Sequence, residues 1–233
     1  MSFVEEKISP NITCYRSELN LLGFPIGTRS TLVRLTNDQL MLVSPIKLSP
    51  ELEVKIKAQG HLKYVVAPNF FHHLYIRPYA EKFPNTQLYY APRLKPKIKD
   101  RISLYHDVLP LSTVNMPWES VLATSELPGM PTLNEFQFFH RQDRVLITTD
   151  TFFNFQNDDQ LGLKAKLVGK LLGVKFGKPA RSLLMKIATK DKSALKTYLY
   201  SLKELKPQII ICAHGEIVRE HTIDVLDNLI SSI

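Results

Sequence analysis

Short apolar runs separated by turn residues dominate the first half of the chain. The pattern predicts strands over Ser30–Leu35 and Gln39–Val43, joined by a short polar turn. The run Leu62–Ala67, which Pro68 ends, is β-branched and almost wholly apolar. A run of this kind is typical of a strand buried on both faces.

The stretches that follow these strands change to helical spacing. Ser49 is a predicted N-cap for a helix that continues to Gln59, with acidic residues in its first turn, where the helix dipole favours them. A second helix is predicted over His72–Phe83 and a strand over Gln87–Ala91. A strand, a helix and a strand at this spacing indicate a parallel crossover.

The second half gives more strands and then mostly helices. Strands are predicted over Trp118–Ser125, Glu135–Phe139, Arg144–Thr149 and Gln208–Ala213; helices are predicted over Asp158–Ala188, over Lys192–Leu205 and from the His214-Gly215 turn to about Ile230. This order predicts an α/β fold in which two sheets pack together and helices cover both outer faces, an αββα sandwich.

Length and composition place the chain among ordinary soluble proteins. Its 233 residues are enough to bury a core without disulfides, and we expect one domain over 1–233. Cys14 and Cys212 fit neither a metal clip nor a disulfide framework, so we expect buried free thiols. The first residues do not resemble a secretory signal, and no window has the ~18 apolar residues of a membrane span. We expect a cytoplasmic protein.

The net charge of +8 is concentrated in one segment. Leu161–Lys196 holds ten basic residues and one acid, with leucines and valines at roughly helical spacing between the lysines. The bland interpretation, which we favour, is the solvated face of an outer helix pair. The alternative is an amphipathic lid that contacts an anionic surface or an acidic substrate. Nucleic-acid binding is not expected, because the segment has few aromatics and the chain has no recognised nucleic-acid motif.

Candidate chemistry gathers where three predicted strands end. His72 and His73 follow the strand that ends at Ala67, Asp150 follows the strand that ends at Thr149, and His214 follows the strand that ends at Ala213. Because the carboxyl ends of strands with crossover helices meet at one edge, we expect these side chains to lie close together. Imidazoles with a carboxylate are a ligand set for Zn²⁺ or Fe²⁺.

Each of these residues also has an ordinary interpretation. A single histidine at a strand end is more often a polar surface residue than a ligand, and an aspartate there often caps the next helix. Only the shared topological position favours a site. The neighbours His72 and His73 point in different directions, so we expect only one of them to face a metal directly.

The three segments resemble motifs of the metallo-β-lactamase superfamily. Leu62–Leu74 resembles its signature strand and loop, Arg144–Phe152 the strand that ends in a metal-bridging aspartate, and Ile209–Gly215 the strand that ends in its terminal metal-binding histidine. The resemblance covers roughly residues 10–220. It implies a sandwich of metallo-β-lactamase type, and within the superfamily the chain most resembles the domain-of-unknown-function family 4336.

The chain departs from that superfamily at one of its two metal sites. Pro68, Phe70 and Met130 stand where the three histidines of the first site are expected. The second set is largely kept, with His72 in the place of the signature aspartate. The resemblance therefore implies a reduced centre with one divalent ion, Zn²⁺ before Fe²⁺ or Mn²⁺. The alternative is a site that binds no metal.

Roles for these residues follow from the resemblance. His73, Asp150 and His214 are expected as ligands, and His72 as a ligand or proton carrier. Glu135 is a candidate general base or additional ligand, although an ordinary strand-surface acid is the commoner case.

The catalytic set is therefore His72, Asp150 and Glu135, and Asn69 is expected to orient a ligand or the substrate. The implied activity is hydrolysis of a small ester, thioester, amide or phosphoester. The alternative is a non-catalytic binding or scaffold domain that kept the fold.

Overall fold

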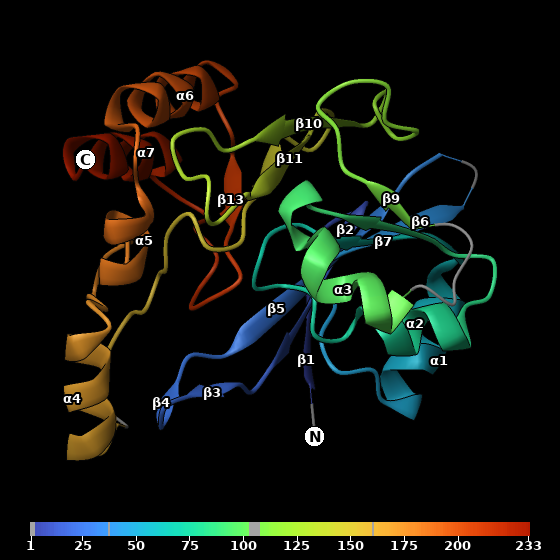
Figure 1. Ribbon diagram of the computed structural model, residues 1–233, viewed down its shortest axis with the longest axis horizontal. Helices are drawn as coiled ribbons and strands as arrows, with labels where there is room; N and C mark the ends of the chain where they lie inside the picture. The colour runs from blue at the N-terminus through green and yellow to red at the C-terminus, as the bar shows by residue number, and fades with distance from the viewer. Residues whose placement is uncertain (1–2, 37, 103–107, 160) are drawn as a thin grey trace.

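The computed structural model describes residues 3–36, 38–102, 108–159 and 161–233 (Figure 1). The larger sheet has the strand order β1-β2-β5-β6-β7-β8-β9, antiparallel from β1 to β6 and parallel from β6 to β9. Its strands are β1 (Phe3–Ser9), β2 (Ile12–Ser17), β5 (Thr28–Arg34), β6 (Gln39–Val43), β7 (His61–Ala67), β8 (Gln87–Tyr90) and β9 (Val108–Pro110).

The smaller sheet has the order β10-β11-β12-β13, in which only the last pair is parallel. Its strands are β10 (Leu122–Glu126), β11 (Phe136–His140), β12 (Val145–Ile147) and β13 (Ile209–Ile211). A separate hairpin consists of β3 (Asn20–Leu21) and β4 (Phe24–Pro25).

Helices cover the outer side of each sheet, and one further helix, α4 (Leu163–Leu171), lies beside the β3–β4 hairpin instead (Figure 1). The other helices are α1 (Pro50–Gln59), α2 (Ile76–Lys82), the short 3-10 helix η1 (Pro92–Leu94), α3 (Lys95–Ile102), α5 (Leu183–Ala188), α6 (Lys192–Glu204) and α7 (Thr222–Ser231). α1 and α2 pack on the larger sheet at β7, and leucines of α6 and α7 pack on the smaller sheet. None of the described helices has the length and apolar character needed to cross a bilayer.

The side chains of the smaller sheet alternate between two cores. Phe138, Ile147 and Ile211 join the core between the sheets, whereas Leu146 and Ile210 join the core beneath α6 and α7. Successive residues of a strand point to opposite faces, so one strand serves both cores. The αββα sandwich predicted from the sequence is confirmed.

Local side-chain bonding explains where the predicted elements differ from the structure. The helix predicted over His72–Phe83 begins only at Ile76, because Asn69 Oδ1 accepts the backbone N–H groups of Phe71 and His72 and holds a turn there. The strand predicted from Trp118 begins at Leu122, because the N–H of Leu122 bonds back to the carbonyl of Trp118.

The long helix predicted over Asp158–Ala188 is instead two helices, α4 and α5. Gly173, between them, has φ +72°, and the Leu183 N–H donates to the Leu172 carbonyl across the break. A left-handed glycine commonly ends a helix in this way. Ser49 caps α1 as predicted, and both cysteines are buried and free, also as predicted.

Candidate metal centre

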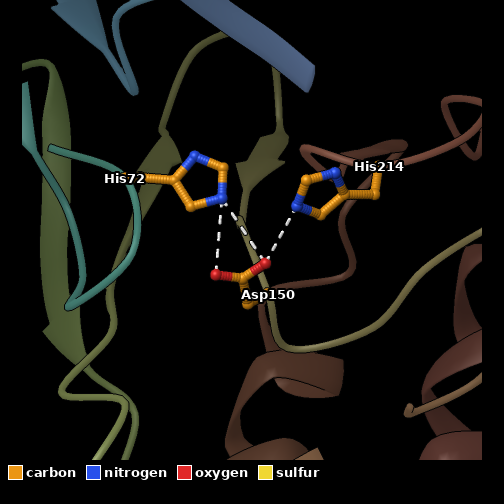
Figure 2. A group of neighbouring side chains, drawn as sticks. All are labelled: His72, Asp150 and His214. Carbon is orange, nitrogen blue, oxygen red and sulfur yellow. Dashed lines mark hydrogen bonds and ion pairs between the residues drawn. The ribbon is translucent and has the colours of Figure 1, made fainter. Parts of the chain in front are cut away.

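Three polar side chains from distant parts of the chain meet at one rim of the sandwich. His72 follows β7, Asp150 follows β12 and His214 follows β13, and Figure 2 shows both imidazoles directed at the carboxylate. His72 Nε2 lies 3.3 Å from Asp150 Oδ2, and His214 Nε2 lies 3.1 Å from Asp150 Oδ1. Ligands of a tetrahedral ion with bonds of about 2.0–2.2 Å lie roughly 3.3–3.6 Å apart, so the His72 separation suits a shared ion and the His214 separation is slightly shorter than one would give.

The protonation of His214 follows from what its other nitrogen contacts. Nδ1 lies 2.7 Å from the carbonyl oxygen of Gly27, which can only accept a hydrogen bond, so Nδ1 carries a proton. In the neutral ring Nε2 is then a bare lone pair that faces a carboxylate oxygen. Two acceptors in this position repel unless a proton or a metal cation lies between them. A backbone carbonyl that fixes the tautomer in this way is the usual support for a metal-binding imidazole.

His72 is held at its far nitrogen in a similar way. Its Nδ1 lies 2.6 Å from the hydroxyl oxygen of Ser44, which follows β6. The sequence reasoning did not find Ser44, although its position just after a strand at this edge was a usable signal. Both imidazoles thus present Nε2 to Asp150 while Nδ1 is bonded to the protein.

Asn69 connects the two sides of the group. Its Nδ2 donates to Asp150 Oδ2 at 2.7 Å and to Thr149 Oγ1 at 2.9 Å, while its Oδ1 accepts the N–H of His72 at 2.9 Å. The side chain is fully buried. It therefore fixes the orientation of Asp150 and the path of the loop that carries His72.

Glu135 lies beneath this arrangement. Its carboxylate accepts the N–H groups of Thr149 and Asp150, at 3.0 and 2.8 Å, and the hydroxyl of Thr151 at 2.6 Å. It is fully buried and is not among the residues that line the neighbouring pocket. The expectation of a strand-surface acid is wrong, and the three bonds from Thr149, Asp150 and Thr151 show that this carboxylate holds the loop that carries Asp150.

The charges of the group interact strongly. Burial opposes ionisation of Asp150, but the adjacent His72 and His214 hold the pKa of its carboxyl well below the usual range. Burial favours neutral His72, yet Asp150 outweighs it and raises the pKa of that imidazole. Burial and the charge of Asp150 raise the pKa of Glu135. A divalent cation would offset the repulsion between the two buried carboxylates.

The loop that presents His214 is fixed from the larger sheet. Arg29 of β5 is buried and donates to the carbonyls of Cys212 and Gly215, the latter at 2.8 Å. Gly215 has φ +86°, and a Cβ there would lie 2.2 Å from the Asn154 carbonyl oxygen, so only glycine fits. The sequence pattern did not single out Arg29, which lies just before the strand predicted over Ser30–Leu35.

The structure leaves His73 outside the convergent group. The one described group of His, Cys, Asp or Glu side chains whose candidate ligand atoms lie within 4.8 Å of one another consists of His72, Asp150 and His214. His73 lines the same pocket but does not belong to that group. It adjoins His72 in a turn, where neighbouring side chains diverge.

The positions expected for a first metal site carry apolar side chains. Met130 is buried in the core beneath α6 and α7, with Arg181 Nη2 3.8 Å from its sulfur. Phe70 packs against the core between the sheets, and Lys97 Nζ lies 3.4 Å above its ring. Pro68 is buried and accepts the N–H of Phe136 through its carbonyl. None of these three side chains can bind a hard metal ion.

A cavity of about 510 Å³ opens beside His72, Asp150 and His214. Its other walls come from the β3–β4 hairpin, the loop after β7, α3 and the α4–α5 segment, and most of these residues are apolar: Leu19, Leu21, Ile26, Phe70, Phe71, Leu74, Phe153, Leu172, Val174, Leu184 and Met185. Lys97 is the charged residue of the wall outside the candidate centre. The volume falls within the range of ligand pockets, about 300–1,000 Å³.

Solved structures with the same architecture include several metallo-β-lactamases and a putative diflavin flavoprotein from Nostoc sp. PCC 7120. VMB-1 has a TM-score of 0.69 at 11% identity, covering 98% of this chain and 95% of its own. FIM-1 from Pseudomonas aeruginosa, in its mono-zinc form, has a TM-score of 0.65 at 12% identity, covering 100% and 96%. The metallo-β-lactamase from Pontibacter korlensis has 0.65 at 14% identity, covering 97% and 100%. These identities indicate a shared fold and no more.

Sequence comparison reaches a narrower group. No curated protein matches the chain. The profile of a domain of unknown function, DUF4336, matches residues 11–161, which include His72 and Asp150 but not His214. The match spans more than half of the chain, and the fold agrees over nearly all of it. The chain therefore belongs to the DUF4336 family and has the metallo-β-lactamase fold.

Proposed function

We propose that the protein is a metal-dependent hydrolase whose single divalent ion is held by His72, Asp150 and His214. The observation that supports it most is the paired arrangement of the imidazoles. Each directs Nε2 at Asp150, at 3.1–3.3 Å, while its Nδ1 is bonded to Ser44 or Gly27. Nitrogen and carboxylate donors of this kind suit Zn²⁺ best and also accept Fe²⁺ or Mn²⁺.

The chain's own residues set the conditions for the reaction. An ion at this position would act as a Lewis acid that polarises the carbonyl or phosphoryl oxygen of the substrate. Asn69 and Glu135 keep Asp150 in place, so the donors do not have to rearrange. The apolar pocket walls hold the body of the substrate and exclude water around the reacting bond.

The pocket also narrows the class of substrate. Apolar walls favour a small ester, thioester or amide with an aliphatic or aromatic group over a highly charged molecule. Lys97, which lies over Phe70 on the wall, offers one positive charge for an acidic substituent. The positive charge of Lys97 could also bind the phosphate group of a phosphoester, so this substrate class stays within the proposal.

Metal analysis of protein purified without an affinity tag tests the centre directly. We expect about one equivalent of Zn, Fe or Mn per chain. Asp150→Asn and His214→Ala should lose it. The matched control is His140→Gln, which changes a buried histidine at the far end of β11. Less than roughly 0.1 equivalent in the unmodified protein, even after dialysis against zinc, would show that the donors bind no ion.

Activity is tested with a panel of chromogenic esters, thioesters and amides of increasing chain length. We expect turnover that a chelator abolishes and that added Zn²⁺ restores. His72→Ala should remove it, and His140→Gln should not.

The second candidate function is a binding domain without catalysis. The apolar residues Pro68, Phe70 and Met130 at the first-site positions favour it, because they supply no ligand for a second ion. Protein that binds the ion but hydrolyses nothing in the panel would support this candidate and exclude the hydrolase for these substrate classes.

A further inference from the structure

Helix α4 exposes a row of leucines instead of burying it. Leu163, Leu167 and Leu171 are spaced by four residues and so share one face, and they are 88, 61 and 68% exposed. The opposite face packs on the β3–β4 hairpin, where a Cβ on Gly169 would lie 2.8 Å from the Phe24 ring. One face of α4 therefore packs on the protein, and its row of leucines on the other face does not take part in that packing.

Other exposed apolar side chains surround the mouth of the pocket. Leu21 in β3, Phe71 and Leu74 in the loop after β7, and Leu184 in α5 all line the pocket and are still 42–55% exposed. Leu22, Leu183 and Ile187 adjoin them and are equally exposed or more so. We call these seven residues, with Leu163, Leu167 and Leu171, the apolar rim.

The three segments of the apolar rim are neighbours in space. Leu21 of the hairpin, Phe71 and Leu74 of the loop after β7 and Leu184 of α5 line one pocket, and so does Leu172, which follows α4 directly. Figure 1 shows α4 and the β3–β4 hairpin side by side, projecting from the body of the sandwich. Exposed apolar side chains that gather in one region of a soluble protein mark a contact surface rather than chance exposure.

Basic residues accompany this surface. From Leu161 to Lys190 the sequence holds eight lysines and arginines and no acid. Lys164, Lys170, Lys175, Lys178 and Lys186 are exposed, whereas Lys166 pairs with Asp158. Leucines with interspersed lysines are what an anionic lipid surface attracts: the charges bring the helix to the headgroups and the leucines enter the acyl boundary.

We propose that the apolar rim and the exposed lysines from Lys164 to Lys186 dock the protein on the surface of an anionic lipid bilayer. The charge favours a bilayer over a second copy of this chain, because two copies would bring the same lysines together. The protein would lie on the bilayer with the pocket mouth facing it. The docking is independent of the proposed hydrolase function, but it would place amphiphilic substrates next to the pocket.

Co-sedimentation with vesicles tests the proposal. Vesicles of phosphatidylcholine with roughly 30% phosphatidylserine are compared with pure phosphatidylcholine, in about 0.05 M and about 0.5 M NaCl. We expect binding to the anionic vesicles in low salt, with a loss of about tenfold or more on omitting phosphatidylserine or raising the salt.

Two sets of variants separate the contributions. Leu163→Ser, Leu167→Ser and Leu171→Ser together should weaken binding about tenfold or more, while Val54→Ser, Val114→Ser and Leu205→Ser, also on exposed apolar residues, should not. Lys164→Gln, Lys170→Gln and Lys175→Gln together should do the same. Lys63→Gln, Lys82→Gln and Lys206→Gln, on exposed lysines elsewhere, should leave binding nearly unchanged.

Three results would overturn the proposal. The first is no binding in low salt. The second is binding that the rim variants and their controls weaken equally. The third is self-association, seen by sedimentation velocity without vesicles and removed by the leucine variant, because it would show that a second copy covers the rim. Asp150→Asn should bind vesicles like the unmodified protein, so failure of the metal centre and failure of docking are distinguishable.

Discussion

The Thr149–Thr151 loop and the α4–α5 segment border the same pocket, yet they place their side chains in opposite ways. In the loop, the buried donors and acceptors are paired inside the protein through Asn69 and Glu135. In α4 and α5, leucines and lysines stand in solvent. The first arrangement fixes atoms for chemistry, and the second leaves apolar area available for contact. Substitutions in the loop should therefore change the stability of the fold, whereas substitutions in α4 and α5 should change binding to vesicles.

The largest effect is expected from Glu135→Ala. The change leaves the Thr149 and Asp150 N–H groups and the Thr151 hydroxyl without their acceptor in a buried place. At about 1–3 kcal/mol per unsatisfied group, we expect a loss of about 3 kcal/mol or more in the free energy of unfolding, measured in urea. Glu126→Ala on β10, which removes a single bond to Asn134, is the control and should cost far less. Equal costs would show that Glu135 does not hold the loop.

Gly215→Ala tests the His214 side of the same loop structure. The new methyl would collide with the Asn154 carbonyl, and the residue would have to keep φ +86°. We expect a loss of about 2–3 kcal/mol in unfolding free energy, together with the loss of metal. Gly162→Ala, where a Cβ meets nothing within 4 Å, should leave both nearly unchanged. Retention of the metal in Gly215→Ala would contradict the role given to this turn.

Asn69→Ala should have an intermediate effect on stability and a clear one on metal binding. It removes the donor to Asp150 and the acceptor for the Phe71 and His72 N–H groups. We expect a cost of about 2 kcal/mol, and a metal affinity about 10–100-fold weaker in a competition titration with a chelating dye. Asn85→Ala, at an exposed asparagine, is the matched control. Unchanged affinity would remove Asn69 from the positioning set.

The smallest effect on stability is expected in α4. Leu163, Leu167 and Leu171 are exposed and bury little area. Their joint change to serine should lower the free energy of unfolding only by the loss in helix propensity, about 0.5 kcal/mol per residue or less, which a small shift in melting temperature would report. The same variant should lose vesicle binding. A large fall in stability would instead show that the leucine row packs within the protein, and the contrast between the two regions would fail.

Hydrophobic periodicity was enough to predict the sandwich because strands such as β6, β7 and β11 are buried along most of their length. It was not enough for β1, whose sequence Phe3–Ser9 mixes glutamates and lysine with apolar residues, since an edge strand has one neighbour and much exposed surface. The predicted start of α2 is wrong for a different reason. A single side chain, Asn69, bonds the backbone that the helix would have used.

The position of His72, Asp150 and His214 just after strands was enough to predict that they lie together at one edge. It gives no information on the residues that lie beneath them. Nothing local to Glu135 or Arg29 shows that either side chain points inward, because their partners lie in other loops, 14–16 residues away for Glu135 and 183 and 186 residues away for Arg29. His73 follows the same strand as His72 and differs only in direction, which one residue of rotation decides. The ligand roles stay predictions until an ion is measured. The assignment of residues 1–233 to one domain also stays a prediction.

The position of Arg29 has a consequence for the mobility of the turn that carries His214. Its guanidinium joins β5 of the larger sheet to the turn that follows β13 of the smaller one. Opening that turn therefore requires separating the sheets and leaving a charge without its acceptors, rather than loosening a surface loop. The amide protons of Ala213 and Glu216, which bond to the carbonyls of Thr149 and Asn154, should accordingly exchange with solvent only as fast as the whole sandwich unfolds, although loops near a pocket commonly exchange much faster.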